Sequence, residues 1–432
     1  MSRAILFAGL VLLNADAIAE QADWQPANRL YDREVLSAPP LLPAHLDQAK
    51  GACDIGTAGM ADAEYRSAEE VGYGREGWED RVAANWTFFN VSPYLGKVLV
   101  IDSRRQGDAM AFRYLANGTH RDLYEPWSSS KIMAFTAAIA AVRQQGIGAD
   151  AMVGDYRVAD LVTSVNSYAP HGKADGNSNA ISSWLLNVAG RDNVTALFHE
   201  RWLRMADPRI RLRGAYASLV FDPGTTTWRS GDGDREAEIA TYAENADDPG
   251  YQAYRCDDCG LTGNKPMTTL AQAEWLKRLA THDTVPSTRH PGLESSDIDV
   301  LLEGRADGPD RPVGGMRAGI GRMLTRAMAD AIAVDTPGLA GKDAKTVLDS
   351  ATDGRWSAWQ KLGAGPSETR GASEVVMLAH VCLPGYQGGR AFTVAAQAGV
   401  PGATEENVSV AAQQLEQVLA VAMRQLLVGS KQ

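Results

Sequence analysis

The segment Tyr124–Phe135 constrains the fold of this chain more than any other, because it places a proline, a run of serines and a lysine before an alanine-rich stretch. Pro126 interrupts the extended segment before it, and the residues after Lys131 have high helix propensity. These features predict a helix that begins near Ser128 and ends near Gly146. Residues three apart share one face of a helix, so this helix would bring the Lys131 amine towards the Ser128 hydroxyl.

A serine and a lysine in this Ser-x-x-Lys spacing can perform nucleophilic chemistry. A serine hydroxyl becomes a useful nucleophile only when a neighbouring base takes its proton. A partly desolvated lysine beside the positive end of a helix dipole has a lowered pKa and can be that base. Such short patterns also recur by chance, and a plain helix cap followed by a solvated lysine has the same residues. The rest of the chain has to decide between the two interpretations.

The N-terminus has the features of a secretory signal. Met1–Arg3 give a basic start, Ala4–Leu13 are apolar, and Ala17–Ala19 form a small-x-small end. The apolar run is too short to span a bilayer. We predict a signal peptide over residues 1–19, no membrane span in the rest of the chain, and a periplasmic or secreted protein.

The composition is that of an acidic globular protein. A chain of 432 residues with 45% hydrophobic residues can bury a substantial core. Its net charge is -11, and Lys and Arg do not cluster along the sequence. Nucleic acid is therefore excluded as a partner, since a phosphate-binding surface needs such clusters.

The spacing of apolar residues changes twice along the chain, from a strand pattern to a helix pattern and back. A polar N-terminal extension, residues 20–96, has helical patterns near 61–71 and 80–89 and is followed by two predicted strands at 97–102 and 109–115. Residues 128–333 are mainly helical, with an irregular insertion at 205–263 that is long enough for a binding loop. Strands return at 356–363, 373–383 and 390–398, with turns at 363–366 and 384–389, before a helix that starts near Thr404.

The four cysteines allow three disulfide pairings in an exported protein. Cys256 and Cys259 could close a tight local bridge, which would leave Cys53 for Cys382. The alternative is a metal site at Cys256-Asp257-Asp258-Cys259, although the sequence offers no second CxxC or nearby histidine. We expect no required cofactor, and the pair leaves zinc binding open.

A hairpin, a serine helix, a helical middle, a three-stranded sheet and a C-terminal helix follow one another in this order. The order resembles the serine penicillin-recognising family of class A β-lactamases and D,D-peptidases, over roughly Lys97 to Val428. The resemblance implies an α/β (α+β) sandwich: an antiparallel sheet flanked by helices, formed by residues 97–127 and 334–428, plus an inserted all-α domain within 128–333.

The family has two further motifs, and both are degenerate here. Asn177-Ser178-Asn179 stands where the family has Ser-Asp-Asn, with Asn179 in the place of the family asparagine and Asn177 in that of the serine. Ser178 can serve only if the loop shifts by one residue. Asn177 and Asn179 also suit a plain helix cap.

The third motif, Lys-Thr-Gly in the family, is matched by Lys361 and Gly363, with Leu362 in place of the threonine. The resemblance implies that Lys361 attracts a substrate carboxylate. Leucine cannot donate the threonine's hydrogen bond, so Thr369 or Arg370 would have to replace it. A charged residue that protects an edge strand from aggregation is the alternative role for Lys361.

By resemblance the chemistry is acyl transfer through a Ser128 acyl-enzyme. Lys131 would take the proton of Ser128, with Ser178 and Asn179 assisting, and Asn177, Lys361, Gly363, Ala364 and Arg370 would bind substrate. Backbone N–H groups of Ser128 and of the turn starting at Ala364 would hold the oxyanion. The deacylating base stays unassigned, because the candidate carboxylates lie in no Glu-x-x-Asn setting: Asp232, Asp234, Glu236, Glu238 and Glu244.

We therefore expect a hydrolase that opens β-lactam antibiotics. The first alternative is a cell-wall D,D-peptidase or esterase of the same fold that acts on peptidoglycan peptide, and the second is a non-catalytic binding protein. The chain has no Gly-x-Ser-x-Gly, His-x-His or His-Glu-x-x-His pattern, which argues against an α/β-hydrolase and a zinc hydrolase.

Overall fold

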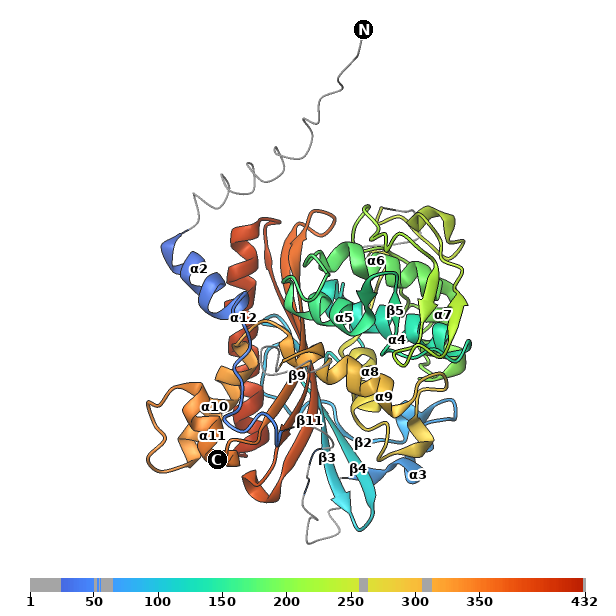
Figure 1. Cartoon of the computed structure of the whole chain (residues 1–432). Helices are drawn as coiled ribbons and strands as arrows, with labels where there is room; N and C mark the ends of the chain where they lie inside the picture. The colour runs from blue at the N-terminus through green and yellow to red at the C-terminus, as the bar shows by residue number, and fades with distance from the viewer. Residues whose placement is uncertain are drawn as a thin grey trace.

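The computed structural model describes residues 25–49, 53, 55, 65–255, 263–304 and 313–429. The predicted signal peptide and the Cys256–Cys259 pair lie outside these residues. A seven-stranded sheet crosses the molecule in the order β1-β4-β3-β11-β10-β9, with β2 beside β4 (Figure 1). Every pairing in it is antiparallel except β2 with β4. Its strands are β1 Arg66–Ser67, β2 Ala83–Asn85, β3 Lys97–Gln106, β4 Ala109–Ala116, β9 Ser357–Ser367, β10 Ala372–Leu383 and β11 Arg390–Pro401.

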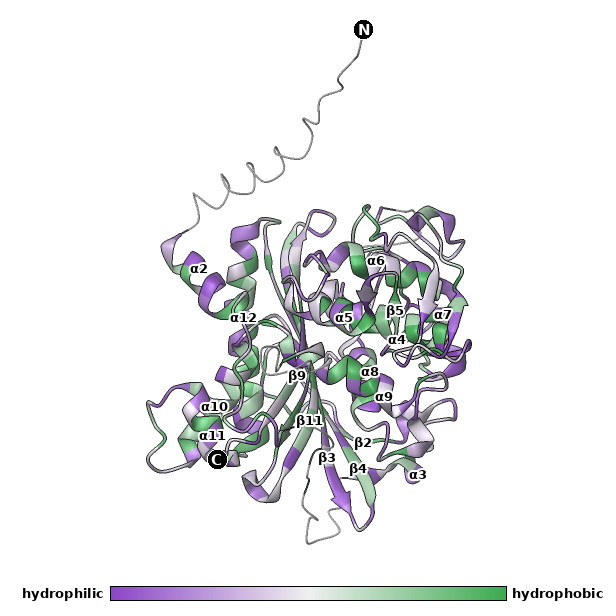
Figure 2. Cartoon of the chain, in the orientation of Figure 1, coloured by the Kyte–Doolittle hydropathy of each residue, from purple (hydrophilic) through white to green (hydrophobic). Residues whose placement is uncertain are grey.

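Both faces of this sheet are covered, because its strands carry apolar side chains on both sides. In β3, Val98 and Val100 join one core cluster and Leu99 and Ile101 join the other, as the two-residue period of a strand requires. One face packs against α10 Met323–Asp335, α11 Ala344–Thr352 and α12 Glu405–Leu427. Figure 2 shows hydrophobic and hydrophilic residues interleaved along α10 and α12, as expected of helices with one buried side.

The other face packs against α8 and the helical region. Figure 1 places this region to one side of the sheet, opposite α12. A four-stranded sheet, β6-β5-β7-β8, accompanies its helices and was not foreseen in the sequence. The elements are α4 Lys131–Arg143, α5 Val158–Ser167, α6 Ser178–Ala189, α7 Arg191–Ala196, η4 Leu197–Arg201, α8 Thr269–Ala280, α9 Ser295–Glu303, β5 Met152–Val153, β6 Tyr156–Arg157, β7 Thr227–Arg229 and β8 Glu236–Glu238.

The expected fold class, an antiparallel sheet flanked by helices with a largely helical insertion, is thus confirmed. Two details differ. The helix expected near residues 80–89 is wrong: η2 Trp78–Asp80 and β2 stand there, because Ala83–Asn85 pair with β4. The turn expected at residues 363–366 is also wrong, because β9 runs on to Ser367 in register with β10.

The first part of the N-terminal extension is joined to the rest of the molecule at two places. Its helix α2 Pro26–Tyr31 lies along α12 (Figure 1), and Tyr31 donates a hydrogen bond of 2.7 Å to Glu416. The π-helical turn η1 Asp32–Leu36 follows α2 and buries Val35 and Leu36. Further along, a disulfide joins Cys53 to Cys382 of β10, which is the long-range pairing considered from the sequence. Among the described residues, no helix combines the length and apolar character that a membrane span requires.

Candidate active site

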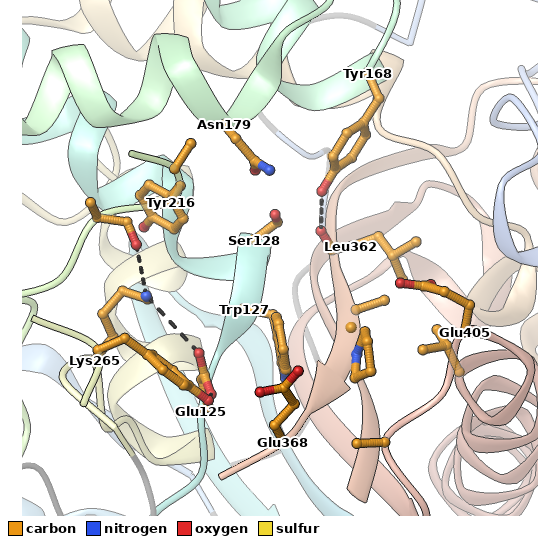
Figure 3. Close-up of a pocket in the computed structure, with 18 of the residues that line it drawn as sticks. Glu125, Trp127, Ser128, Tyr168, Asn179, Tyr216, Lys265, Leu362, Glu368 and Glu405 are labelled. Carbon is orange, nitrogen blue, oxygen red and sulfur yellow. Dashed lines mark hydrogen bonds and ion pairs between the residues drawn. The ribbon is translucent and has the colours of Figure 1, made fainter. Parts of the chain in front are cut away.

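Ser128 stands in a short 3-10 turn, η3 Trp127–Ser130, directly before α4. The helix was expected to begin near Ser128, and its regular part begins three residues later, at Lys131. Trp127 holds the turn in place: its φ of 50° is unusual for a bulky residue, and its indole Nε1 donates to Glu374 at 3.1 Å. Ser128 lines a cavity of about 1060 Å³ and lies at the centre of the side chains in Figure 3.

The Lys131 amine is fully buried beside this turn. It donates to Ser178 Oγ at 2.9 Å and to Asn179 Oδ1 at 2.6 Å. Burial, with the charge of Lys265 as a smaller cause, holds the Lys131 pKa well below its usual range. An uncharged amine has two N–H bonds, and both are used here, so its lone pair is left to accept a proton.

Two of the three residues of the second motif contact Lys131. Ser178 and Asn179 are the first residues of α6, and Ser178 donates onward to the Val165 carbonyl at 2.8 Å. Asn177 is the N-cap of α6 instead: its side chain accepts from the Ala180 N–H at 3.1 Å. Asn179 lines the cavity, and Asn177 does not.

Lys361 of the third motif is also fully buried and does not line the cavity. Its Nζ donates to the Leu362 carbonyl at 3.3 Å and lies 3.9 Å from the centre of the Tyr168 ring. Burial, and then the charge of Lys131, hold the Lys361 pKa well below its usual range. Tyr168 therefore separates this amine from the cavity.

Tyr168 is a site residue that sequence reasoning missed. It follows α5 at a φ of 55°, and its hydroxyl donates to the Leu362 carbonyl at 3.1 Å (Figure 3). A hydrogen bond with Ser128 tends to lower its pKa, but burial of the hydroxyl end outweighs this and raises the pKa, although 37% of the residue is exposed. The phenol thus stays protonated at neutral pH. No motif marks it, because it stands in the polar segment between α5 and α6.

Strand β9 approaches the serine turn so closely that only glycine fits at Gly363. A Cβ there would lie 2.6 Å from the Pro126 carbonyl oxygen and the Ser129 nitrogen, and 2.9 Å from the Ser128 nitrogen. Gly365 is similarly required, since a Cβ would meet the Trp127 ring at 2.4 Å. Ala364, between them, lines the cavity. The backbone of β9 next to Ala364 therefore lies very close to the Ser128 N–H group.

Arg370 is not brought to the main cavity. Its guanidinium contacts Glu125 at 2.8 Å and also pairs with Glu374. Thr369 does not line the cavity either. Neither residue therefore replaces the missing threonine hydroxyl at Leu362.

The cavity wall opposite Leu362 holds a second tyrosine and a third lysine (Figure 3). The Tyr216 hydroxyl lies 2.9 Å from Ser130 Oγ, and its ring lies 5.3 Å from Lys131 Nζ. Lys265 donates to the Ala215 carbonyl at 2.9 Å and lies 4.0 Å from Glu125. Both residues come from segments without a recognisable motif.

The carboxylates considered for deacylation lie elsewhere. Glu236 and Glu238 are exposed on β8, where Glu236 pairs with Arg229 and Glu238 accepts from Thr226. Neither they nor Asp232, Asp234 and Glu244 line the cavity. The described part of the chain also contains no group of three or more His, Cys, Asp or Glu side chains arranged to hold a metal ion.

The comparisons with known proteins concern the fold of this chain and not the chemistry of Ser128. No family model and no curated protein matches the sequence. The chain is similar to several solved structures. PBP-A is 12% identical and has a TM-score of 0.39, over 78% of this chain and 92% of that one. The β-lactamase from Burkholderia vietnamiensis is 14% identical at 0.38, over 77% and 93%. The β-lactamase from Sphaerobacter thermophilus is 11% identical at 0.39, over 76% and 91%. At these values the chemistry of Ser128 has to be judged from its own geometry.

Proposed function

We propose that this protein is an exported serine hydrolase that opens β-lactams, or closely related acyl compounds, through an acyl-enzyme at Ser128. One observation carries the proposal: the buried Lys131 amine, three residues after a serine that lines a cavity, spends both of its N–H bonds on Ser178 and Asn179. A solvated lysine behind a helix cap would have neither the burial nor these partners. The geometry therefore favours the nucleophilic interpretation of the Ser-x-x-Lys pattern.

In the proposed reaction, Ser128 Oγ attacks the substrate carbonyl while its proton passes to Lys131. The carbonyl oxygen becomes negative and is stabilised by the backbone N–H groups of Ser128 and of the Ala364 segment. Tyr168 stays protonated, and its hydroxyl can turn from the Leu362 carbonyl to pass its proton to the leaving nitrogen as the carbon–nitrogen bond breaks. The proton that Lys131 took from Ser128 then replaces the one that Tyr168 lost, so both side chains end as they began. An ester linking Ser128 to the acyl group results.

The second candidate is a D,D-peptidase or acyl-accepting enzyme that hydrolyses its β-lactam adduct slowly. Two of the four carboxylates that line the cavity favour it. Glu125 is held by Arg370, Lys265 and Tyr254, and Glu368 is paired with Arg255 at 2.7 Å. A carboxylate that activates water needs access to the acyl carbon, and these two are engaged with cations. This candidate predicts rapid acylation followed by slow release.

Labelling with a fluorescent penicillin, followed by mass spectrometry of the intact protein and its peptides, tests the proposal. We expect one covalent adduct, on Ser128, which Ser128→Ala abolishes. Ser218→Ala is the matched control, because Ser218 is another serine that lines the same cavity. Persistence of the adduct for many minutes selects the second candidate, whereas its rapid loss with turnover selects the β-lactamase. Failure of penicillins and activated esters to label Ser128 would refute both and leave a non-catalytic binding protein.

A further inference from the structure

We infer that the cavity next to Ser128 takes an acyl substrate whose group beside strand β9 is apolar and carries no negative charge. This inference rests on the proposed function, since it names the substrate class of the same site. Four larger apolar side chains that line the cavity belong to, or pack against, the core cluster between the sheet and α12: Leu36, Ile320, Leu362 and Val408. We call this set the apolar subsite. Leu36, Leu362 and Val408 are between 4% and 5% exposed, so its lining is a packed surface.

The apolar subsite is continuous with the serine. Leu362 precedes Gly363, whose backbone touches the Ser128 turn, and the Leu362 carbonyl accepts the hydrogen bond from Tyr168. Ser128 and Leu362 line the same cavity, so a substrate whose carbonyl carbon lies at Ser128 can extend to Leu362. Figure 3 shows the Tyr168 hydroxyl bonded to the Leu362 carbonyl, with the Leu362 side chain beyond that carbonyl as seen from Ser128.

The cations at this cavity are unsuited to bind a carboxylate at the apolar subsite. Lys361 is buried behind Tyr168, and Arg370 pairs with two carboxylates. Of the two cations that line the cavity, Arg255 pairs with Glu368 and Lys265 lies across the cavity beside Glu125. A substrate carboxylate at Leu362 would lose its hydration without gaining an ion pair.

Acidic residues at the rim act in the same direction. Asp32, from the N-terminal extension, and Glu405, the first residue of α12, both line the cavity. In Figure 3 the Glu405 side chain reaches from α12 towards Leu362. Like charges placed together lower affinity, so the rim disfavours an anionic group and admits a neutral one. The N-terminal extension, through Asp32 and Leu36, is thus part of the specificity of the site.

Benzylpenicillin and its methyl ester form a matched pair that tests this inference, since they differ only in the charge of the carboxyl group. We expect the ester to acylate Ser128 about tenfold faster, measured as the second-order rate constant from timed intact-mass spectra. Leu362→Thr should reduce this ratio about tenfold, because the hydroxyl can donate to a carboxylate. Asp32→Asn combined with Glu405→Gln should accelerate acylation by the acid more than acylation by the ester, and so reduce the ratio of the two rate constants. Glu34→Gln is the control, since Glu34 is exposed on η1, outside the cavity.

A tenfold preference for the acid, with Ser128 still labelled, would overturn the inference and leave the proposed function intact. If neither compound labels Ser128, the proposed function fails. The subsite is then still tested by equilibrium binding of the pair to Ser128→Ala. Tighter binding of the ester would support the subsite, and equal or weaker binding would refute it.

Discussion

Replacing Gly363 with alanine should disable acylation while leaving the chain folded. The new methyl group would lie 2.6 Å from the Pro126 oxygen and the Ser129 nitrogen, whereas ordinary contact begins near 3.4 Å. Both neighbours are backbone atoms and cannot rotate away. Strand β9 and the serine turn would therefore have to separate by about 0.8 Å.

A displacement of this size is large for catalysis and moderate for stability. Misplacing reacting groups by about 1 Å can cost about 100-fold in rate, so we expect acylation of Ser128 in Gly363→Ala to fall about 100-fold. Overpacking a well-packed site costs about 1–3 kcal/mol of unfolding free energy, which leaves a protein of this size folded.

Two measurements check this prediction on the same sample. Timed intact-mass spectra with a penicillin give the acylation rate, and urea unfolding followed by circular dichroism gives the stability. Gly74→Ala is the control, since a Cβ there meets no atom within 4 Å. A folded Gly363→Ala protein that acylates within about threefold of the parent would refute the close packing of β9 on the serine turn.

Four further predictions concern Lys131, Tyr168, Glu274 and the disulfide. Lys131→Met should abolish acylation of Ser128. In the parent protein the acylation rate should fall as the pH drops through the lowered Lys131 pKa, because only the uncharged amine accepts the proton. An acylation rate that does not change with pH contradicts this role. Tyr168→Phe should slow acylation by lactams about 100-fold yet affect activated esters less, since their leaving groups need no proton; equal losses in both assays argue against proton delivery. Glu274→Gln should lower the unfolding free energy by about 3–5 kcal/mol, measured by urea unfolding, because the buried cations Lys277 and Arg278 lose their partner; a change below about 1 kcal/mol speaks against this. Breaking the Cys53–Cys382 disulfide with Cys53→Ala/Cys382→Ala should cost about 2–5 kcal/mol in the same assay, and dithiothreitol should destabilise the parent more than the double variant.

The sequence predicted the strands and helices correctly where the spacing of apolar residues was regular. The stripe that begins at Val408 predicted α12, and Thr404 caps that helix as expected, accepting from the Asn407 N–H at 3.2 Å. The strands β10 and β11 were found because their apolar residues are continuous and bounded by turn residues. Gly363–Pro366 misled the prediction, since glycines usually mark turns. Here Gly363 and Gly365 let two backbone segments approach, a requirement that sequence alone does not separate from a turn.

The second motif shows how a single residue limits prediction from sequence. Successive residues of a helix point about 100° apart, so a shift of one position decides which side chain meets Lys131. The sequence left open whether Asn177 or Ser178 would do so. Because the Asn177 side chain caps α6, Ser178 and Asn179 become its first two residues, and both reach the amine. The sequence alone does not tell a residue that caps α6 from one that contacts Lys131. The residue at which the helix begins decides between these two roles.

Lys361 shows that the role of a charged side chain is also hard to predict from sequence, because the sequence does not show whether it is buried. In sequence it is a cation on an edge strand, and the resemblance made it a binder of carboxylate. In the structure it is fully buried, and its nearest aromatic neighbour is the ring of Tyr168. Burial, and then the charge of Lys131, disfavour the charged form of this amine, which is the form that would attract an anion. Its contacts with Leu362 and Tyr168 fit it to support the residue that bonds to Ser128. Leu362 in place of the family threonine is consistent with this position of Lys361, because a lysine that does not line the cavity cannot bind a carboxylate together with a hydroxyl there.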